Sequence, residues 1–124
     1  MDAQGIKRFF FVFINCWLAV VIYAIIIFLI SSVPGRDIPS LFSFQDVVFH
    51  IIEFGILSLL VNRAISRQNR NLGFVRRFLF VVIICLVYAM SDELHQGFVP
   101  GRDSSFIDFG YDSIGIILVS LVYP

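Results

Sequence analysis

FFFVFINCWLAVVIYAIIIFLI, residues 9–30, decides the fold class of this chain. The segment has 22 residues without one charged side chain, and a helix that crosses a bilayer needs about 20 predominantly apolar residues. Lys7 and Arg8 precede it, as they would in a secretory signal, but the apolar part of such a signal runs only about 7–15 residues. We therefore predict a retained membrane span over residues 9–30.

The composition of the whole chain agrees with a membrane protein. The 124 residues are 59% hydrophobic and include 15 phenylalanines, and the mean hydropathy is +0.93. A soluble domain of this length could not hide so many apolar side chains, because small domains leave a large share of their residues exposed. We expect one membrane domain over residues 1–124. Nucleic acid is not expected as a partner, since the formal net charge is zero.

Three further apolar segments follow the first one. We predict helices over residues 44–61, 75–96 and 105–123, so the expected fold is an all-α bundle of four transmembrane helices. Pro-Gly dipeptides interrupt the chain in the loops 31–43 and 97–104. A connector over residues 62–77 contains five arginines and no acidic residue.

Positive and negative charges are separated along the chain. Seven of the nine basic residues flank the starts of the first and third spans, whereas every acidic residue except Asp2 lies in or near the loops 31–43 and 97–104. Cytoplasmic loops of membrane proteins carry an excess of Lys and Arg. Both termini and the connector are therefore predicted to be cytoplasmic, and the acidic ends of the spans are predicted to face outward.

The word VPGRD occurs twice, at residues 33–37 and again at residues 99–103. Each copy joins two spans at the predicted outer face, and another acidic residue, Asp46 or Asp112, follows nine positions after its final Asp. Two repeated helical hairpins that run parallel would explain this pattern. A Pro-Gly turn followed by a solvated Arg-Asp pair is the simpler alternative.

Polar side chains gather at the predicted outer ends of the last three helices, at spacings of three and four residues that place them on shared helix faces. The set consists of Asp46, His50 and Glu53 on the second helix, Ser91, Asp92, Glu93, His95 and Gln96 on the third, and Asp108 and Asp112 on the fourth. Ionisable side chains in membrane spans are costly unless they are paired, so such a set is a functional candidate.

These residues resemble the VanZ-like family, which is named for an accessory protein of resistance to the glycopeptide teicoplanin. The matching features are Ser31-Ser32-x-Pro34-Gly35, Asp46-x-x-x-His50-x-x-Glu53, Ser91-Asp92-Glu93-x-His95-Gln96, and the run from Pro100-Gly101-Arg102 to Asp108. Two positions depart from the family pattern, since members often carry Tyr near Glu53 and Asn where Asp112 stands. The resemblance implies a multi-pass protein of the bacterial plasma membrane that is linked to the cell envelope, without a settled reaction.

Two kinds of centre fit these residue types. His50, Glu53, Asp92 and His95 put a carboxylate and an imidazole one turn apart on two helices, which is how helix bundles build divalent metal sites. A purely structural polar network would have the same spacing. In acid–base chemistry, the alternative to a metal centre, His50 or His95 is the candidate base or nucleophile. The candidate partners of these histidines are Asp92, Glu93 and Asp46.

The two repeated arginines indicate the class of substrate. Arg36 and Arg102 are the expected phosphate ligands, because a guanidinium group binds phosphate through two parallel hydrogen bonds. Further expected substrate contacts are Gln96, Asp108 and Ser91. We therefore favour hydrolysis or transfer at an envelope phospholipid or polyprenyl phosphate, linked to glycopeptide resistance.

Two other functions stay open at this point. One is a module that binds a lipid-linked envelope intermediate or a glycopeptide without chemistry. The other is a proton-coupled transporter, which fits less well because the cytoplasmic halves of the spans hold almost no ionisable residues. Either function is compatible with a homo-oligomer.

Overall fold

The computed structural model describes residues 2–124 and contains four α-helices in that range. They are α1 (Ala3–Ser31), α2 (Gln45–Gln68), α3 (Phe74–Gln96) and α4 (Phe106–Val122), with a short 3-10 helix, η1 (Gly35–Asp37), after α1. No strand occurs within residues 2–124. The predicted all-α class and the four predicted helices are confirmed.

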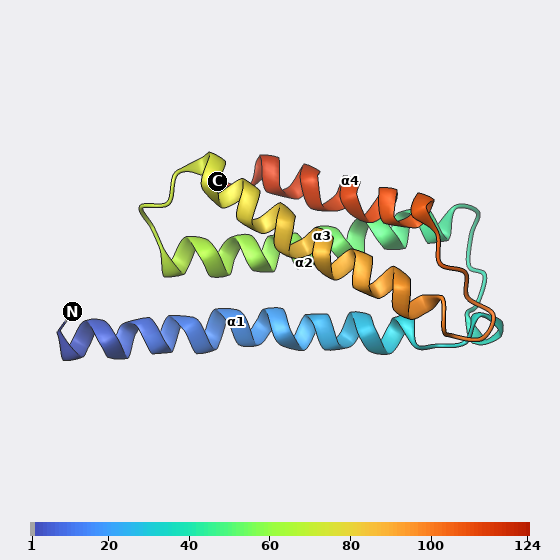
Figure 1. Ribbon diagram of the computed structural model, residues 1–124, viewed down its shortest axis with the longest axis horizontal. Coiled ribbons are helices and arrows are strands. Elements are labelled where there is room, and N and C mark those ends of the chain that lie inside the picture. The colour runs from blue at the N-terminus through green and yellow to red at the C-terminus, as the bar shows by residue number, and fades with distance from the viewer. Residues whose placement is uncertain (1) are drawn as a thin grey trace.

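The chain runs up and down, so its loops gather at two opposite ends (Figure 1). The loops after α1 and after α3 lie together at what we call the loop end. Both termini and the short segment between α2 and α3 lie toward the other end, the connector end. This arrangement brings the two VPGRD copies to one end and most of the arginines to the other.

Three of the helices in residues 2–124 are long and apolar enough to cross a membrane: α1 with 29 residues, α2 with 24 and α3 with 23. α4 has 17 residues, which corresponds to about 25 Å at the rise of an α-helix. Large apolar side chains point outward from all four helices, as Phe11, Phe49, Val87 and Leu118 do. The chain is therefore a multi-pass membrane protein.

α2 is the central helix of the bundle and packs against the other three. Its closest partner is α4, because Gly55 and Gly115 let the two backbones approach. A Cβ atom on Gly115 would lie 2.2 Å from the carbonyl oxygen of Ile51. Small residues of this kind drive helix packing in membranes, where burial of apolar surface gains little.

Buried hydroxyl and amide groups add to the α2–α4 contact. The Oγ atoms of Ser58 and Ser120 lie 2.8 Å apart, and Asn62 Nδ2 donates a hydrogen bond of 2.9 Å to the carbonyl oxygen of Ser58. All three side chains are fully buried. The hydroxyl pair joins α2 to α4, whereas the Asn62 bond stays within α2 and leaves Nδ2 3.4 Å from Ser120 Oγ on α4.

α2 is longer than the sequence analysis predicted, since it continues from residue 61 to Gln68. In this extension Val61, Asn62, Ala64 and Ile65 are buried, whereas Arg63 and Arg67, four residues apart, share the exposed face. The extension is thus an amphipathic helix, and its arginines do not mark a loop. Only residues 69–73 separate α2 from α3.

The two VPGRD copies contact each other at the loop end. The backbone N–H of Gly35 donates a hydrogen bond of 3.1 Å to the carbonyl oxygen of Pro100. A Cβ atom on Gly35 would lie 1.7 Å from the carbonyl oxygen of Gly101, and Gly101 itself has a φ of +75°. Two repeated hairpins would place their turns in this way, although only the first copy forms a 3-10 helix.

Candidate functional site

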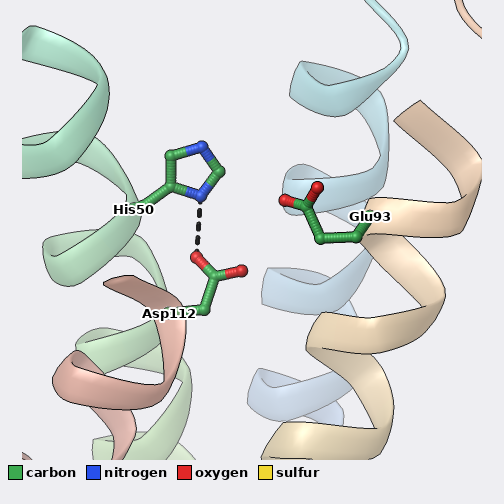
Figure 2. Close-up of side chains that lie close together, drawn as sticks. All are labelled: His50, Glu93 and Asp112. Atoms are coloured by element: carbon green, nitrogen blue, oxygen red, sulfur yellow. Dashed lines mark hydrogen bonds and ion pairs between the residues drawn. The ribbon is translucent and has the colours of Figure 1, made fainter. Parts of the chain in front are cut away.

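A buried histidine–carboxylate pair joins α2 to α4 near the loop end. His50 Nδ1 lies 2.7 Å from Asp112 Oδ1, and the two side chains are 11% and 0% exposed (Figure 2). The pair forms because Asp112 lies one turn before Gly115, where α4 lies against the backbone of α2. The other ring nitrogen of His50, Nε2, makes no side-chain hydrogen bond within residues 2–124.

Glu93 approaches this pair from α3, and its carboxylate points toward the other two side chains (Figure 2). One ligand atom from each of His50, Glu93 and Asp112 lies within 4.8 Å of the other two. We call these three residues the His50–Glu93–Asp112 group. It is the one cluster of three such side chains within residues 2–124 whose spacing could hold a metal ion.

Two oxygens of the group have no hydrogen-bond partner among residues 2–124: Glu93 Oε1 and Asp112 Oδ2. The other carboxylate oxygen of Glu93, Oε2, accepts a hydrogen bond of 2.9 Å from the backbone N–H of Ser105, the N-cap residue of α4. Buried carboxylate oxygens in proteins nearly always have a partner. A cation, a water molecule or a proton shared by the two carboxylates would satisfy the two free oxygens.

A second polar network lies beside the group and ends in an arginine. Gln96 Nε2 donates to Asp92 Oδ2 at 2.9 Å, and Arg102 donates to Gln96 Oε1 at 3.0 Å. Gln96 Nε2 also lies 3.4 Å from Ser31 Oγ at the end of α1. Asp92 and Gln96 are buried, and Arg102 is half-buried. The network therefore fixes the guanidinium group of the second VPGRD copy against the ends of α1 and α3.

His95 lies apart from the group, on the side of α3 that faces α1. Its Nε2 atom is 2.9 Å from Ser32 Oγ, and its ring stacks on Phe28 with 4.4 Å between the ring centres. This histidine therefore contributes to the α1–α3 contact.

The structure separates the other residues predicted for the site into two sets. Glu53 and Asp108 lie near enough to the His50–Glu93–Asp112 group for their charges to interact with it. Asp46, Arg36 and Ser91 are exposed, and the side chain of Arg36 is 85% exposed.

The four residues predicted to bind a metal do not form a compact group. Their set, His50, Glu53, Asp92 and His95, is not among the clusters of possible metal ligands within residues 2–124. His50 instead groups with Glu93 and Asp112. Asp112 was predicted to belong to the polar set at the outer helix ends, but no catalytic, substrate or metal role was assigned to it. Its spacing of three residues from Gly115 is a signal that it faces a closely packed helix.

A small cavity leads to Glu93 from the side of the bundle. Its volume is about 60 Å³, and its polar lining comes from Glu93, Ser104 and Ser105. The remaining lining is apolar and consists of Met90, Leu94, Phe106 and Phe109. Glu93 is thus the member of the group that lies at a cavity between α3 and α4.

Comparison with known proteins identifies the family. The model of the VanZ/LLP1 family matches residues 10–124, which is nearly the whole chain. Neither the curated proteins nor the solved structures gave a match. The chain belongs to the VanZ/LLP1 family.

Proposed function

We propose that this protein acts on the phosphate group of an envelope lipid, either a phospholipid or a polyprenyl phosphate, by hydrolysis or transfer. The observation that carries the proposal is the His50–Glu93–Asp112 group, in which a buried carboxylate orients a histidine and two carboxylate oxygens lack partners. The proposed location is the outer leaflet of the bacterial plasma membrane. The distribution of arginines supports that orientation.

His50 is the proposed base. With Nδ1–H donating to Asp112, the ring is held in one orientation and Nε2 carries the free lone pair. In hydrolysis, a water oxygen would attack phosphorus while its proton passes to Nε2. The bond from phosphorus to the leaving oxygen would break, and the same proton would return to that oxygen.

A divalent cation fits the two free carboxylate oxygens. Mg²⁺ is commonly held by one or two carboxylates together with water and the phosphate oxygens of a substrate. Glu93 Oε1 and Asp112 Oδ2 would supply the protein ligands, while Asp112 Oδ1 keeps its hydrogen bond to His50. Such an ion would stabilise negative charge on the reacting phosphate.

The surroundings of the group support a lipid substrate. The cavity at Glu93, about 60 Å³, has room for about two water molecules and not for a lipid chain. The apolar side chains of α3 and α4 that flank it would face an acyl or isoprenoid chain at its edge. Arg102 is held by Gln96 through one hydrogen bond and keeps further N–H groups for a phosphate. Membership of the VanZ/LLP1 family supports a link between such an activity and glycopeptide resistance.

Phosphate release from polyprenyl phosphates and diphosphates tests the proposal. The purified protein is assayed in proteoliposomes with Mg²⁺ or Mn²⁺, beside the variants His50→Ala, Asp112→Asn and Glu93→Gln. General acid–base catalysis contributes about 10²–10⁴-fold, so His50→Ala should lose at least about a hundredfold. Asp112→Asn, which no longer holds the His50 ring, and Glu93→Gln, which loses a carboxylate ligand, should also lower the activity. Asp103→Asn, in the exposed part of the loop, is the matched control and should keep wild-type activity.

A non-catalytic binding module is the alternative function, because the group is nearly closed to solvent. It predicts no phosphate release with any metal, together with lipid-phosphate binding that is weakened by Arg102→Gln. Release that is equal in wild type and His50→Ala would rule out the proposed chemistry.

Metal analysis of the purified protein is a separate test of the cation. We expect about one bound divalent ion in wild type, its loss in Asp112→Asn, and its retention in the exposed variant Asp46→Asn. Wild-type protein that is free of metal and fully stable after dialysis against Mg²⁺ or Mn²⁺ would contradict the cation.

A further inference from the structure

The connector end of the bundle carries a second polar hollow, far from the site described above. This hollow, the arginine cleft, has a volume of about 350 Å³ and lies between the start of α1 and the end of α2. Its lining residues are Gly5, Arg8, Phe9 and Val12 of α1, Arg67 and Gln68 of α2, and Arg70 of the segment after α2.

The charge of the arginine cleft is not compensated within the chain. Arg8, Arg67 and Arg70 form no salt bridge and donate no side-chain hydrogen bond to any of the residues that the structure describes. The single acid at this end, Asp2, caps α1 by accepting a hydrogen bond of 2.7 Å from Gly5 N. Three guanidinium groups therefore surround a cleft of a size that suits a phosphate-containing headgroup.

An entirely apolar groove begins beside the arginine cleft and runs along the surface of α1. This α1 groove has a volume of about 550 Å³ and is lined by Phe13, Ile14, Trp17, Leu18 and Val21. It faces outward from the bundle, toward the space that lipid occupies in a membrane.

Aromatic side chains join the arginine cleft to the α1 groove. The ring of Phe9, which lines the cleft, stacks on Phe13 in the groove, and Phe13 lies against Trp17. Trp17 Nε1 donates a hydrogen bond of 2.8 Å to Oε1 of Gln68, which lines the cleft. The positive cleft and the apolar groove are thus two parts of one continuous surface.

We propose that this surface binds an anionic glycerophospholipid. The arginine cleft takes the phosphodiester group, and the α1 groove takes one acyl chain. The separation of charge from apolar surface matches the order of these groups in a phospholipid. The positive-inside rule assigns this end to the cytoplasmic leaflet, where basic pockets between membrane helices bind anionic headgroups. The proposal does not depend on the proposed function.

The single tryptophan of the chain makes the proposal measurable. Trp17 lies in the α1 groove, so a lipid with bromine atoms on its acyl chains quenches its fluorescence on contact. The protein is reconstituted into vesicles of phosphatidylcholine that contain increasing amounts of either brominated phosphatidylglycerol or brominated phosphatidylcholine. We expect stronger quenching by the brominated phosphatidylglycerol at equal mole fraction.

Two double variants distinguish lipid binding in the arginine cleft from general attraction to the positive charge of the connector end. Arg67→Gln with Arg70→Gln should lower the preference for phosphatidylglycerol by about 25-fold, from roughly fivefold per arginine. Arg63→Gln with Arg76→Gln removes as much charge outside the cleft, and it should lower the preference much less than the first double variant does. If the first double variant fails to insert, Arg8→Gln on α1 carries the same test with about a fivefold expected loss.

Three outcomes would overturn the proposal. The first is equal quenching by the two brominated lipids, and the second is a preference that survives in Arg67→Gln with Arg70→Gln. The third is competition by inorganic phosphate at millimolar concentration that removes the preference, which would assign the arginine cleft to a soluble phosphate.

Discussion

Replacing Gly115 by Ala tests the contact between α2 and α4 that assembles the candidate site. The added Cβ atom would lie 2.2 Å from the carbonyl oxygen of Ile51 and 3.1 Å from the backbone nitrogen of Gly55. Both atoms belong to the backbone of α2, so no side chain can turn aside. The two helices would have to move apart.

The size of the effect follows from two opposing terms. Overpacking a tight contact costs about 1–3 kcal/mol of the free energy of unfolding. Replacing Gly by Ala inside a helix returns about 0.5–1 kcal/mol. Gly110 on the same helix has nothing within 4 Å of an added Cβ atom, so Gly110→Ala receives only the second term. Gly115→Ala should therefore be about 1–3 kcal/mol less stable than Gly110→Ala.

Titration with SDS in mixed micelles, followed by the fluorescence of Trp17, measures this difference. Gly55→Ala should lie between the two other variants, because its Cβ atom would meet the side chain of Val119 at 3.4 Å and the carbonyl oxygen of Gly115 at 3.7 Å, neither of which is a severe clash. Equal stability of Gly115→Ala and Gly110→Ala would refute the close approach of α2 and α4. It would also remove the reason for pairing His50 with Asp112.

Three further predictions concern the two ends of the bundle. Gly35→Ala should separate the VPGRD copies and make the loop end sensitive to limited proteolysis, whereas Gly73→Ala, with open space around it, should not; equal cleavage would contradict the loop contact. Arg77 donates hydrogen bonds to the carbonyl oxygens of Tyr123 and Pro124, so Arg77→Gln should cost about 1–3 kcal/mol of the free energy of unfolding in the SDS titration, and the exposed neighbour variant Arg76→Gln should cost almost nothing. Cys16 and Cys85 are buried, so they should add little background in a labelling experiment. With the loop end outside, an impermeant maleimide applied to intact cells should label Asp103→Cys and not Asn71→Cys; the reverse labelling would invert the predicted orientation.

The helices were predictable from the sequence because bilayer thickness sets the length of an apolar segment. The segments predicted at residues 9–30 and 75–96 lie within or nearly coincide with α1 and α3. The same criterion predicted the end of α2 too early, at residue 61. It detects only continuous apolar length, whereas the last two turns of α2 are amphipathic, with Arg63 and Arg67 on the exposed face.

The members of the candidate site were predictable only as helix faces. Spacing placed His50 with Asp46 and Glu53, and it placed Asp92 with His95, since neighbours on one helix are all that a periodic pattern can reveal. The structure pairs His50 with Asp112 of another helix and places His95 against Ser32 of α1. These pairs depend on how each helix is oriented about its own axis in the bundle and on the close approach of α4 to α2 at Gly115.

Local chemistry alone determined that this chain forms a bundle of membrane helices with its acidic residues toward one end. Apolar length and the separation of charge are properties of contiguous residues, so they can be read without a fold. Which carboxylate each histidine meets was decided only in three dimensions. It depends on where a missing side chain, as at Gly115, lets one backbone approach another, and on which polar atoms such an approach leaves without a partner.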